Sequence, residues 1–79
     1  MPTFQISIVN ESFASTDNHE VHSLDAATAQ ALKAALQIGS DEVAGGKPFF
    51  AAEVEVKAAD EIVSRFVVSI GTSPIALTG

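Results

Sequence analysis

The two apolar segments in the second half of the chain differ in their pattern. Residues 49–57 alternate between apolar and polar side chains, which is typical of a strand with one buried and one solvated face. Residues 62–70 follow a short polar turn around Asp60 and place apolar side chains on both faces. A strand covered on both sides needs more protein than one helix of this chain supplies. We therefore expect the sheet to bury part of its surface against another copy or a partner.

The first half of the chain predicts a strand, a turn and a shorter second strand. Residues 3–9 alternate apolar and polar side chains and predict a strand that faces a core. Residues 10–12, Asn-Glu-Ser, are typical of a turn. The sequence Ser-Thr-Asp-Asn at residues 15–18 predicts a second turn or loop, and residues 20–22 predict a brief edge strand beside the first.

A helix is predicted to begin at Leu24. Ser23 is a residue type that caps helix N-termini, and Asp25 complements the positive end of the helix dipole. Gly39 can end the helix, and residues 40–42 can cap a further turn before residues 44–46, Ala-Gly-Gly, break it. The apolar arc covers roughly 180°, wider than the ~100° that one contact surface needs. Its members are Leu24, Ala27, Ala31, Ala35 and Ile38, with Leu32 and Leu36 at the side.

The order strand, strand, helix, strand, strand predicts one small α+β domain. We expect a mostly antiparallel ββ-α-ββ sheet with the helix packed on one face. The domain is predicted to span residues 1–70. Residues 71–79 are predicted to form a C-terminal tail, either frayed or docked on a neighbour through Ile75 and Leu77.

The composition narrows the classes of partner. Ten acidic and four basic residues give a net charge of −6, and the basic residues are scattered along the sequence. Without a basic stripe, neither nucleic acid nor an anionic membrane is an expected partner. The absence of cysteine excludes disulfides and thiolate metal sites and fits a cytoplasmic protein. The first residues carry no basic and apolar leader pattern, so we expect no signal peptide or membrane span.

One polar cluster has residue types that bind metals. It comprises Asp17, His19, Glu20 and His22. The two histidines are three residues apart, whereas the zincin motif needs a spacing of four on a helix. In an extended segment, only Glu20 with His22, or Asp17 with His19, could share an ion. We expect a solvated edge strand and no metal, with His19, Glu20 and His22 as the candidates if a metal binds.

The paired carboxylates of Glu53 and Glu55 are the other candidates for chemistry. They project from the same strand face, with Lys57 next on that face and Arg65 as a possible cross-strand neighbour. This arrangement is typical of the solvated side of a sheet. We therefore predict no catalytic residue, no cofactor and no enzymatic activity. Of the adjacent pair Phe49-Phe50, one ring is predicted to join the core and the other to face solvent, because neighbouring strand residues point in opposite directions.

Four blocks of the sequence resemble a family of short bacterial proteins classed as a domain of unknown function. The blocks are FQISIVN at residues 4–10, AALQIG at 34–39, GKPFFAAEV at 46–54, and RFVVSIG at 65–71 followed by Ser73-Pro74. The last two blocks are the most specific. The resemblance implies a bacterial origin and small size, and it assigns no catalytic residue.

A weaker similarity is to dodecin, a small β-α-β-β protein that assembles into hollow shells and stores flavin. The shared part is the helix followed by a long hairpin. Dodecin sandwiches its flavin with a tryptophan, which this chain lacks, and this chain has an extra segment before its helix. The similarity implies a closed oligomer more than it implies flavin storage.

The sequence predicts a non-enzymatic interaction or accessory module, acting as a homo-oligomer or as a subunit of a larger assembly. The candidate interface residues are Val63, Arg65 and Val67 on the sheet and Leu32 and Leu36 on the helix flank. One alternative is a flavin-binding or metal-binding protein whose pocket, with the polar cluster, forms at an oligomer interface. Another is an antitoxin-like neutraliser of a basic protein.

Overall fold

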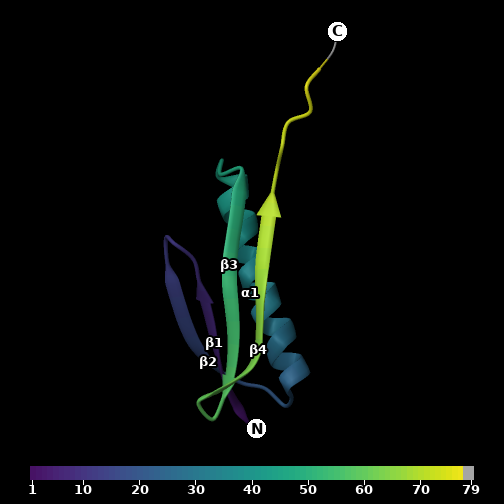
Figure 1. Ribbon diagram of the computed structural model, residues 1–79. Helices are drawn as coiled ribbons and strands as arrows, with labels where there is room; N and C mark the ends of the chain where they lie inside the picture. The colour runs from purple at the N-terminus through teal and green to yellow at the C-terminus, as the bar shows by residue number, and fades with distance from the viewer. Residues whose placement is uncertain (78–79) are drawn as a thin grey trace.

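One helix lies on one face of a four-stranded antiparallel sheet in the computed structural model, which describes residues 1–77 (Figure 1). The strand order is β2-β1-β3-β4, so β1 and β3 are central and β2 and β4 form the two edges. The predicted ββ-α-ββ order and α+β class are confirmed. The elements are β1 (Thr3–Val9), β2 (Ala14–Glu20), α1 (Leu24–Ala44), β3 (Phe49–Ala58) and β4 (Glu61–Gly71).

The core forms between α1 and the sheet face that it covers. Alternate residues of β1 and β3 point to this face, as the period of two predicts, and α1 meets them with small side chains. Because the alanine surface is thin, the helix backbone lies close to the strands. The buried core residues are Phe4, Ile6, Ile8, Ala27, Ala31, Ala35, Phe50, Ala52, Val54, Val56 and Val68.

Gly39 lies inside α1, so the helix does not end at this residue, and it ends instead where residues 44–46 were predicted to break it. The helix continues to Ala44 and ends at Gly45, whose N–H donates to the Asp41 carbonyl. Gly39 is buried, and a Cβ at this position would lie 2.7 Å from both Ile70 Cδ1 and Phe50 Cδ2. The glycine is therefore a packing residue that lets the helix approach β3 and β4. The predicted cap is confirmed, since the Ser23 hydroxyl accepts from the Ala26 N–H at 3.1 Å.

The structure also corrects the prediction for residues 15–22. The predicted turn at 15–18 lies in the middle of β2, and β2 ends at Glu20, where the brief edge strand was predicted to begin. Pairing with β1 overrides the turn preference of these residues, because polar side chains are tolerated on a solvated edge. The turn comes earlier: the Asn10 carboxamide oxygen accepts from the backbone N–H groups of Ser12 and Phe13.

The second hairpin follows its prediction closely. Ala59 and Asp60 have φ angles of 51° and 69°, the left-handed values that a two-residue hairpin turn requires. The pairing of β3 with β4 is regular from Phe49 to Val56 and shifts between Val56 and Lys57. This shift leaves Val63 as an extra residue near the start of β4.

The chain leaves the sheet after Gly71. The Thr72 N–H donates to the Pro48 carbonyl at 2.8 Å, and the described residues beyond it have no regular structure. Ile75 and Leu77 are 89% and 97% exposed. The described part of the predicted tail therefore contacts little of its own molecule, and docking on a neighbour stays a prediction. The last two residues of the predicted tail, 78 and 79, lie outside the described residues.

We expect Gly39→Ala to destabilise the protein by about 1–3 kcal/mol, because the added methyl group overpacks the contact with Phe50 and Ile70. Urea unfolding followed by circular dichroism measures the change. The neighbouring exposed position supplies the control: Ser40→Ala should be neutral or stabilising, because alanine favours the helix. A Gly39→Ala protein that is as stable as the Ser40→Ala protein would contradict the packing role of Gly39.

Candidate functional site

The outer edge of β4 is the largest unpaired stretch of backbone next to apolar side chains. β4 is an edge strand of 11 residues and carries no proline. Its exposed apolar side chains are Val67 at 64%, Ile62 at 51% and Val63 at 39%. A long, apolar edge strand is a template for pairing with another strand.

The neighbouring flank of α1 adds apolar side chains beside the same edge, on the opposite face of the sheet from Val67. Gln30 donates toward β2, since its side-chain Nε2 lies 2.9 Å from His19 Nδ1. Leu32 follows by two residues, about 200° further round the helix, and therefore lies on the opposite flank, toward β4. Leu36 lies one turn beyond Leu32, and both leucines are 41% exposed. We call Ile62, Val63, Val67, Leu32 and Leu36 the β4 surface.

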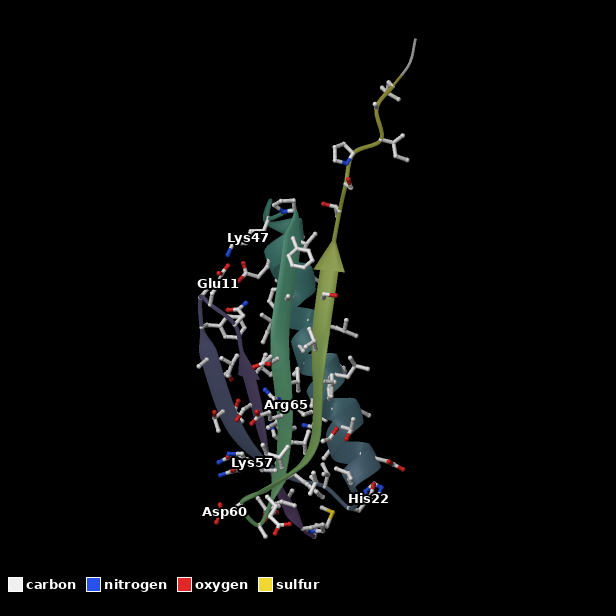
Figure 2. All side chains as sticks on the ribbon, in the orientation of Figure 1. Glu11, His22, Lys47, Lys57, Asp60 and Arg65 are labelled. Carbon is white, nitrogen blue, oxygen red and sulfur yellow. The ribbon has the colours of Figure 1, made fainter. Side chains whose placement is uncertain are left out.

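Arg65 is the only basic residue of β4, and its side chain turns away from the edge (Figure 2). Its guanidinium lies 3.1 Å from Glu53 Oε1 and 3.5 Å from Glu55 Oε2, on the sheet face that α1 does not cover. Arg65 is therefore a cross-strand neighbour of both glutamates, as predicted, and forms ion pairs with them. Because these carboxylates hold the Arg65 side chain over β3, its charge does not discourage another strand from pairing with the β4 edge.

The opposite edge of the sheet, formed by β2, is protected against pairing with another strand. β2 carries Asp17, His19 and Glu20 along seven residues and has no large aliphatic side chain. Charged and polar side chains on an edge strand discourage pairing with another sheet. The two edges of the sheet therefore differ in chemistry, and only β4 combines a free edge with apolar side chains among the described residues.

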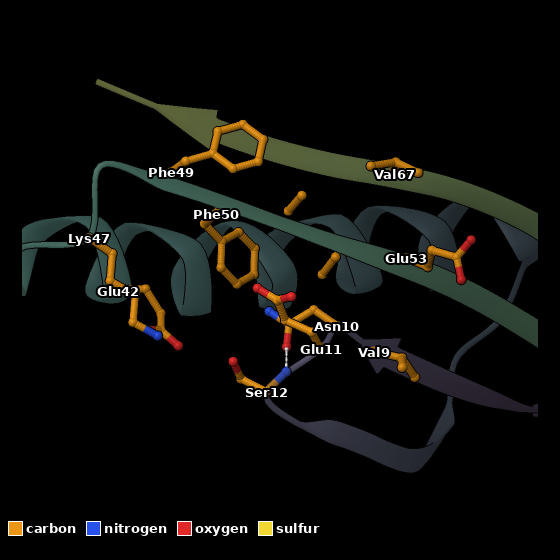
Figure 3. Close-up of a pocket in the computed structure, with 12 residues that line it drawn as sticks. Val9, Asn10, Glu11, Ser12, Glu42, Lys47, Phe49, Phe50, Glu53 and Val67 are labelled. Carbon is orange, nitrogen blue, oxygen red and sulfur yellow. Dashed lines mark hydrogen bonds and ion pairs between the residues drawn. The ribbon is translucent and has the colours of Figure 1, made fainter. Parts of the chain in front are cut away.

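A hollow of about 520 Å³ lies where β1 ends (Figure 3). β1 pairs with β3 only as far as Val9 opposite Glu53, so residues 49–52 of β3 have no β1 neighbour. The hollow is a consequence of this unequal strand length, which the sequence analysis did not predict. Its lining residues are Val9, Asn10, Glu11, Ser12, Glu42, Lys47, Phe49, Phe50, Ala51, Ala52, Glu53 and Val67.

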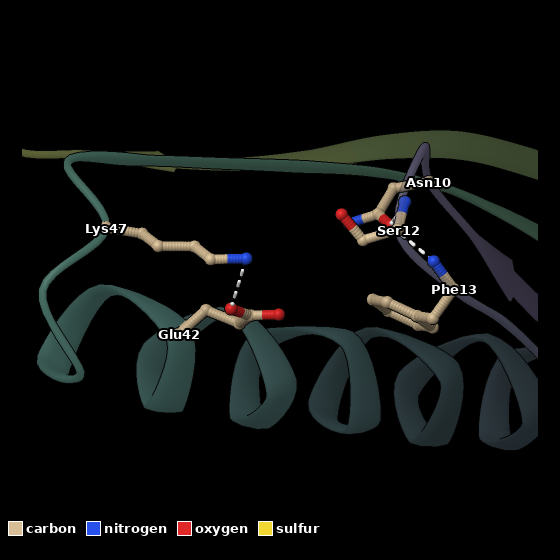
Figure 4. Close-up of polar contacts among 5 residues, drawn as sticks. All are labelled: Asn10, Ser12, Phe13, Glu42 and Lys47. Atoms are coloured by element: carbon tan, nitrogen blue, oxygen red, sulfur yellow. Dashed lines mark hydrogen bonds and ion pairs between the residues drawn. The ribbon is translucent and has the colours of Figure 1, made fainter.

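Two polar contacts border the hollow (Figure 4). On one side, the Asn10 side chain holds the β1–β2 turn through the Ser12 and Phe13 N–H groups. On the other side, Lys47 Nζ lies 3.0 Å from Glu42 Oε2. These contacts fix loop and helix ends and leave the lysine neutralised by its partner.

The two adjacent phenylalanines at the hollow confirm their prediction. The Phe50 ring is buried at 4% exposure and stacks on Phe13 with ring centroids 6.5 Å apart, whereas Phe49 is 62% exposed. Phe49 and Val67 lie on the open sheet face, on the adjacent strands β3 and β4. The open face therefore carries one exposed apolar side chain on each of these strands, with Ala51 and Ser69 between them.

The polar cluster is not brought together. His19 contacts Gln30 on the helix-covered side, and Glu20, the next residue of β2, points to the other face. His22 lies in the exposed segment before the helix. Within residues 1–77, no three histidine, aspartate or glutamate side chains are grouped so that they could hold a metal. In the same residues, no serine or threonine hydroxyl is hydrogen-bonded to a histidine.

No protein-family model matches the chain, and neither do any curated proteins or solved structures. The resemblances to the bacterial family and to dodecin therefore stay predictions. Within residues 1–77, no helix combines the length and the apolar character needed to cross a membrane.

We expect Zn²⁺ to leave the thermal unfolding midpoint unchanged relative to EDTA, because His19, Glu20 and His22 do not converge. Thermal unfolding followed by circular dichroism measures this directly. A bound metal at 100 times its dissociation constant would add about 2.7 kcal/mol to stability. A rise in the midpoint with Zn²⁺ that a His19→Ala, His22→Ala protein loses would contradict this expectation.

Proposed function

We propose that this protein is a non-enzymatic interaction module that associates through the β4 surface, as a homo-oligomer or as a subunit of a larger assembly. The observation that carries the proposal is the contrast between the two sheet edges: β2 is polar and charged, whereas β4 is long, apolar and unpaired. Binding by strand addition uses such an edge, because main-chain hydrogen bonds supply affinity and side chains supply specificity.

The exposed helix flank supports the same surface. Leu32 and Leu36 lie beside the β4 edge, so a partner that extends the sheet also meets two leucines. Apolar side chains at the centre of a contact, with polar groups around them, are typical of protein interfaces. Neither leucine is needed for the core of one molecule, whose helix contact uses Ala27, Ala31 and Ala35.

The distribution of polar residues favours binding over chemistry. The carboxylates of Glu53 and Glu55 are paired with Arg65, and Glu42 is paired with Lys47. Paired charges on a solvated surface position side chains and do not assemble a nucleophile with its base. A bacterial cytoplasmic setting belongs to the same proposal, and the absence of cysteine and the family resemblance support it.

We expect Val67→Lys and Leu36→Lys each to weaken self-association at least tenfold, or by ~1.4 kcal/mol. Leu36→Lys puts a charge into an apolar contact, and Val67→Lys puts a lysine on the edge strand that pairs, which discourages strand pairing. Sedimentation equilibrium across a range of concentrations measures the effect. Lysine lowers the net negative charge of the chain, so general repulsion between molecules cannot explain a loss of association.

The matched control is Val9→Lys. Val9 is 41% exposed, as is Leu36, and it lies on β1, which β3 separates from β4. This variant should associate as the wild type does. A wild-type protein that remains monomeric at high micromolar concentration, or equal weakening by all three variants, would contradict self-association through the β4 surface.

A further inference from the structure

We propose that the partner of β4 is β4 of a second copy, paired antiparallel about a two-fold axis at Val67. This inference rests on the proposed function and specifies its partner. The result is one continuous eight-stranded sheet, built from two four-stranded sheets, with the two α1 helices side by side on the same face.

The backbone of β4 sets which residues face the second copy. The Thr72 N–H donates to the Pro48 carbonyl, so Thr72 directs its backbone groups toward β3. Backbone groups alternate along a strand, and the pairing with β3 is regular over this stretch. The even-numbered residues from Phe66 to Ile70 therefore face β3, and the odd-numbered residues Arg65, Val67 and Ser69 direct their backbone groups outward.

The side chains favour an axis at Val67 over other positions. This axis places Val67 opposite Val67 of the second copy, and Arg65 opposite Ser69. Val67 is the most exposed large apolar side chain of β4, so its burial gains the most. An axis at Arg65 would place two guanidinium groups opposite each other, which is destabilising.

The exposed leucine flank of α1 lies at the same level along β4 as this two-fold axis. α1 runs alongside β4 in the same direction, and Gly39 lies against Ile70 (Figure 1). Val67 lies three residues before Ile70, about 10 Å along the strand. The same distance along α1 is about seven residues, which leads from Gly39 back to Leu32. Leu32 therefore lies level with Val67.

The spacing of the two helices fits direct contact. α1 contacts β3 and β4 most and β1 to a lesser extent, so its axis is about one to one and a half strand spacings, or roughly 5–7 Å, from the two-fold axis. The two helices are then about 10–14 Å apart, slightly wider than the 8–10 Å of closely packed helices, a gap that leucine side chains from both helices can bridge. Leu32 and Leu36 of both copies fill the space between them.

This geometry favours a second copy over a foreign extended peptide. A peptide added to β4 would pair with its backbone but would leave Leu32 and Leu36 exposed, since it brings no helix. A second copy covers the strand edge and the helix flank together. Val67 also lines the hollow beside β1, so the contact reaches one rim of the hollow, whereas the other lining residues belong to β1, β3, α1 and their connections.

A single-cysteine variant tests the pairing, because the chain contains no cysteine. In a Val67→Cys protein the two thiols face each other across the axis, at a Cα separation of about 5.5 Å that permits a disulfide. We expect mild oxidation to convert most of this variant into a linked dimer. In a Ser69→Cys protein the thiols lie about 13 Å apart along the strands, too far for a disulfide.

The Val9→Cys protein measures the rate of disulfide formation by random collisions. The Val67→Cys protein should form its disulfide at least tenfold faster than the Ser69→Cys and Val9→Cys controls. A bismaleimide linker should also join two Leu32→Cys chains. Thermal unfolding of the reduced variants shows that each is folded, and Val67 and Leu32 are exposed enough to accept cysteine.

Two results would overturn the pairing and can be told apart. If the protein associates but Val67→Cys crosslinks no faster than Val9→Cys, the two-fold pairing is wrong and the proposed function stands. If the wild-type protein is monomeric at high micromolar concentration and Val67→Cys crosslinks no faster than the controls, both the pairing and self-association through β4 are wrong.

Discussion

The structure depends on the close contact between one helix and the face of the four-stranded sheet that it covers. A stripe of small residues, Ala27, Ala31, Ala35 and Gly39, brings the backbone of α1 near β3 and β4. The contact buries one face of these strands, and it also places the leucine flank of the helix beside the outer edge of the sheet. One helix cannot cover more, so the folded molecule keeps apolar surface at β4.

The positions of the charged side chains also leave β4 as the edge at which another chain can bind. Polar and charged side chains occupy β2 and the open face near Glu53 and Glu55, where Arg65 is held by both carboxylates. Each exposed ion pair contributes little to stability. Their effect is on where another chain can bind: the charges cover one edge and the centre of the open face, and they leave β4 free.

The sequence predicts the parts of the fold that local pattern determines. Alternation predicted β1 and β3, a run of apolar residues predicted β4, and Ser23 predicted the helix start. The Glu-Glu-Lys face of β3 predicted Arg65 as a cross-strand neighbour. β2 was predicted as an edge strand but placed too late in the sequence, because its polar residues have turn preferences that pairing with β1 overrides. Gly39 was misinterpreted because its role comes from Phe50 and Ile70, which are distant in sequence. The sequence predicted that the sheet and the helix carry more apolar side chains than one molecule can bury. It did not predict that β4 is an edge strand, because strand order is not determined by local sequence.

Residue-resolved amide hydrogen exchange at two protein concentrations tests the central claim most directly, because it reads each side of β4 separately. If β4 pairs with another chain, the outward amides of Arg65, Val67 and Ser69 exchange slowly at high concentration and faster on dilution, while Phe66, Val68 and Ile70 stay slow throughout. If the outward amides exchange rapidly at both concentrations while the inward amides remain slow, β4 is a free edge and the account is wrong.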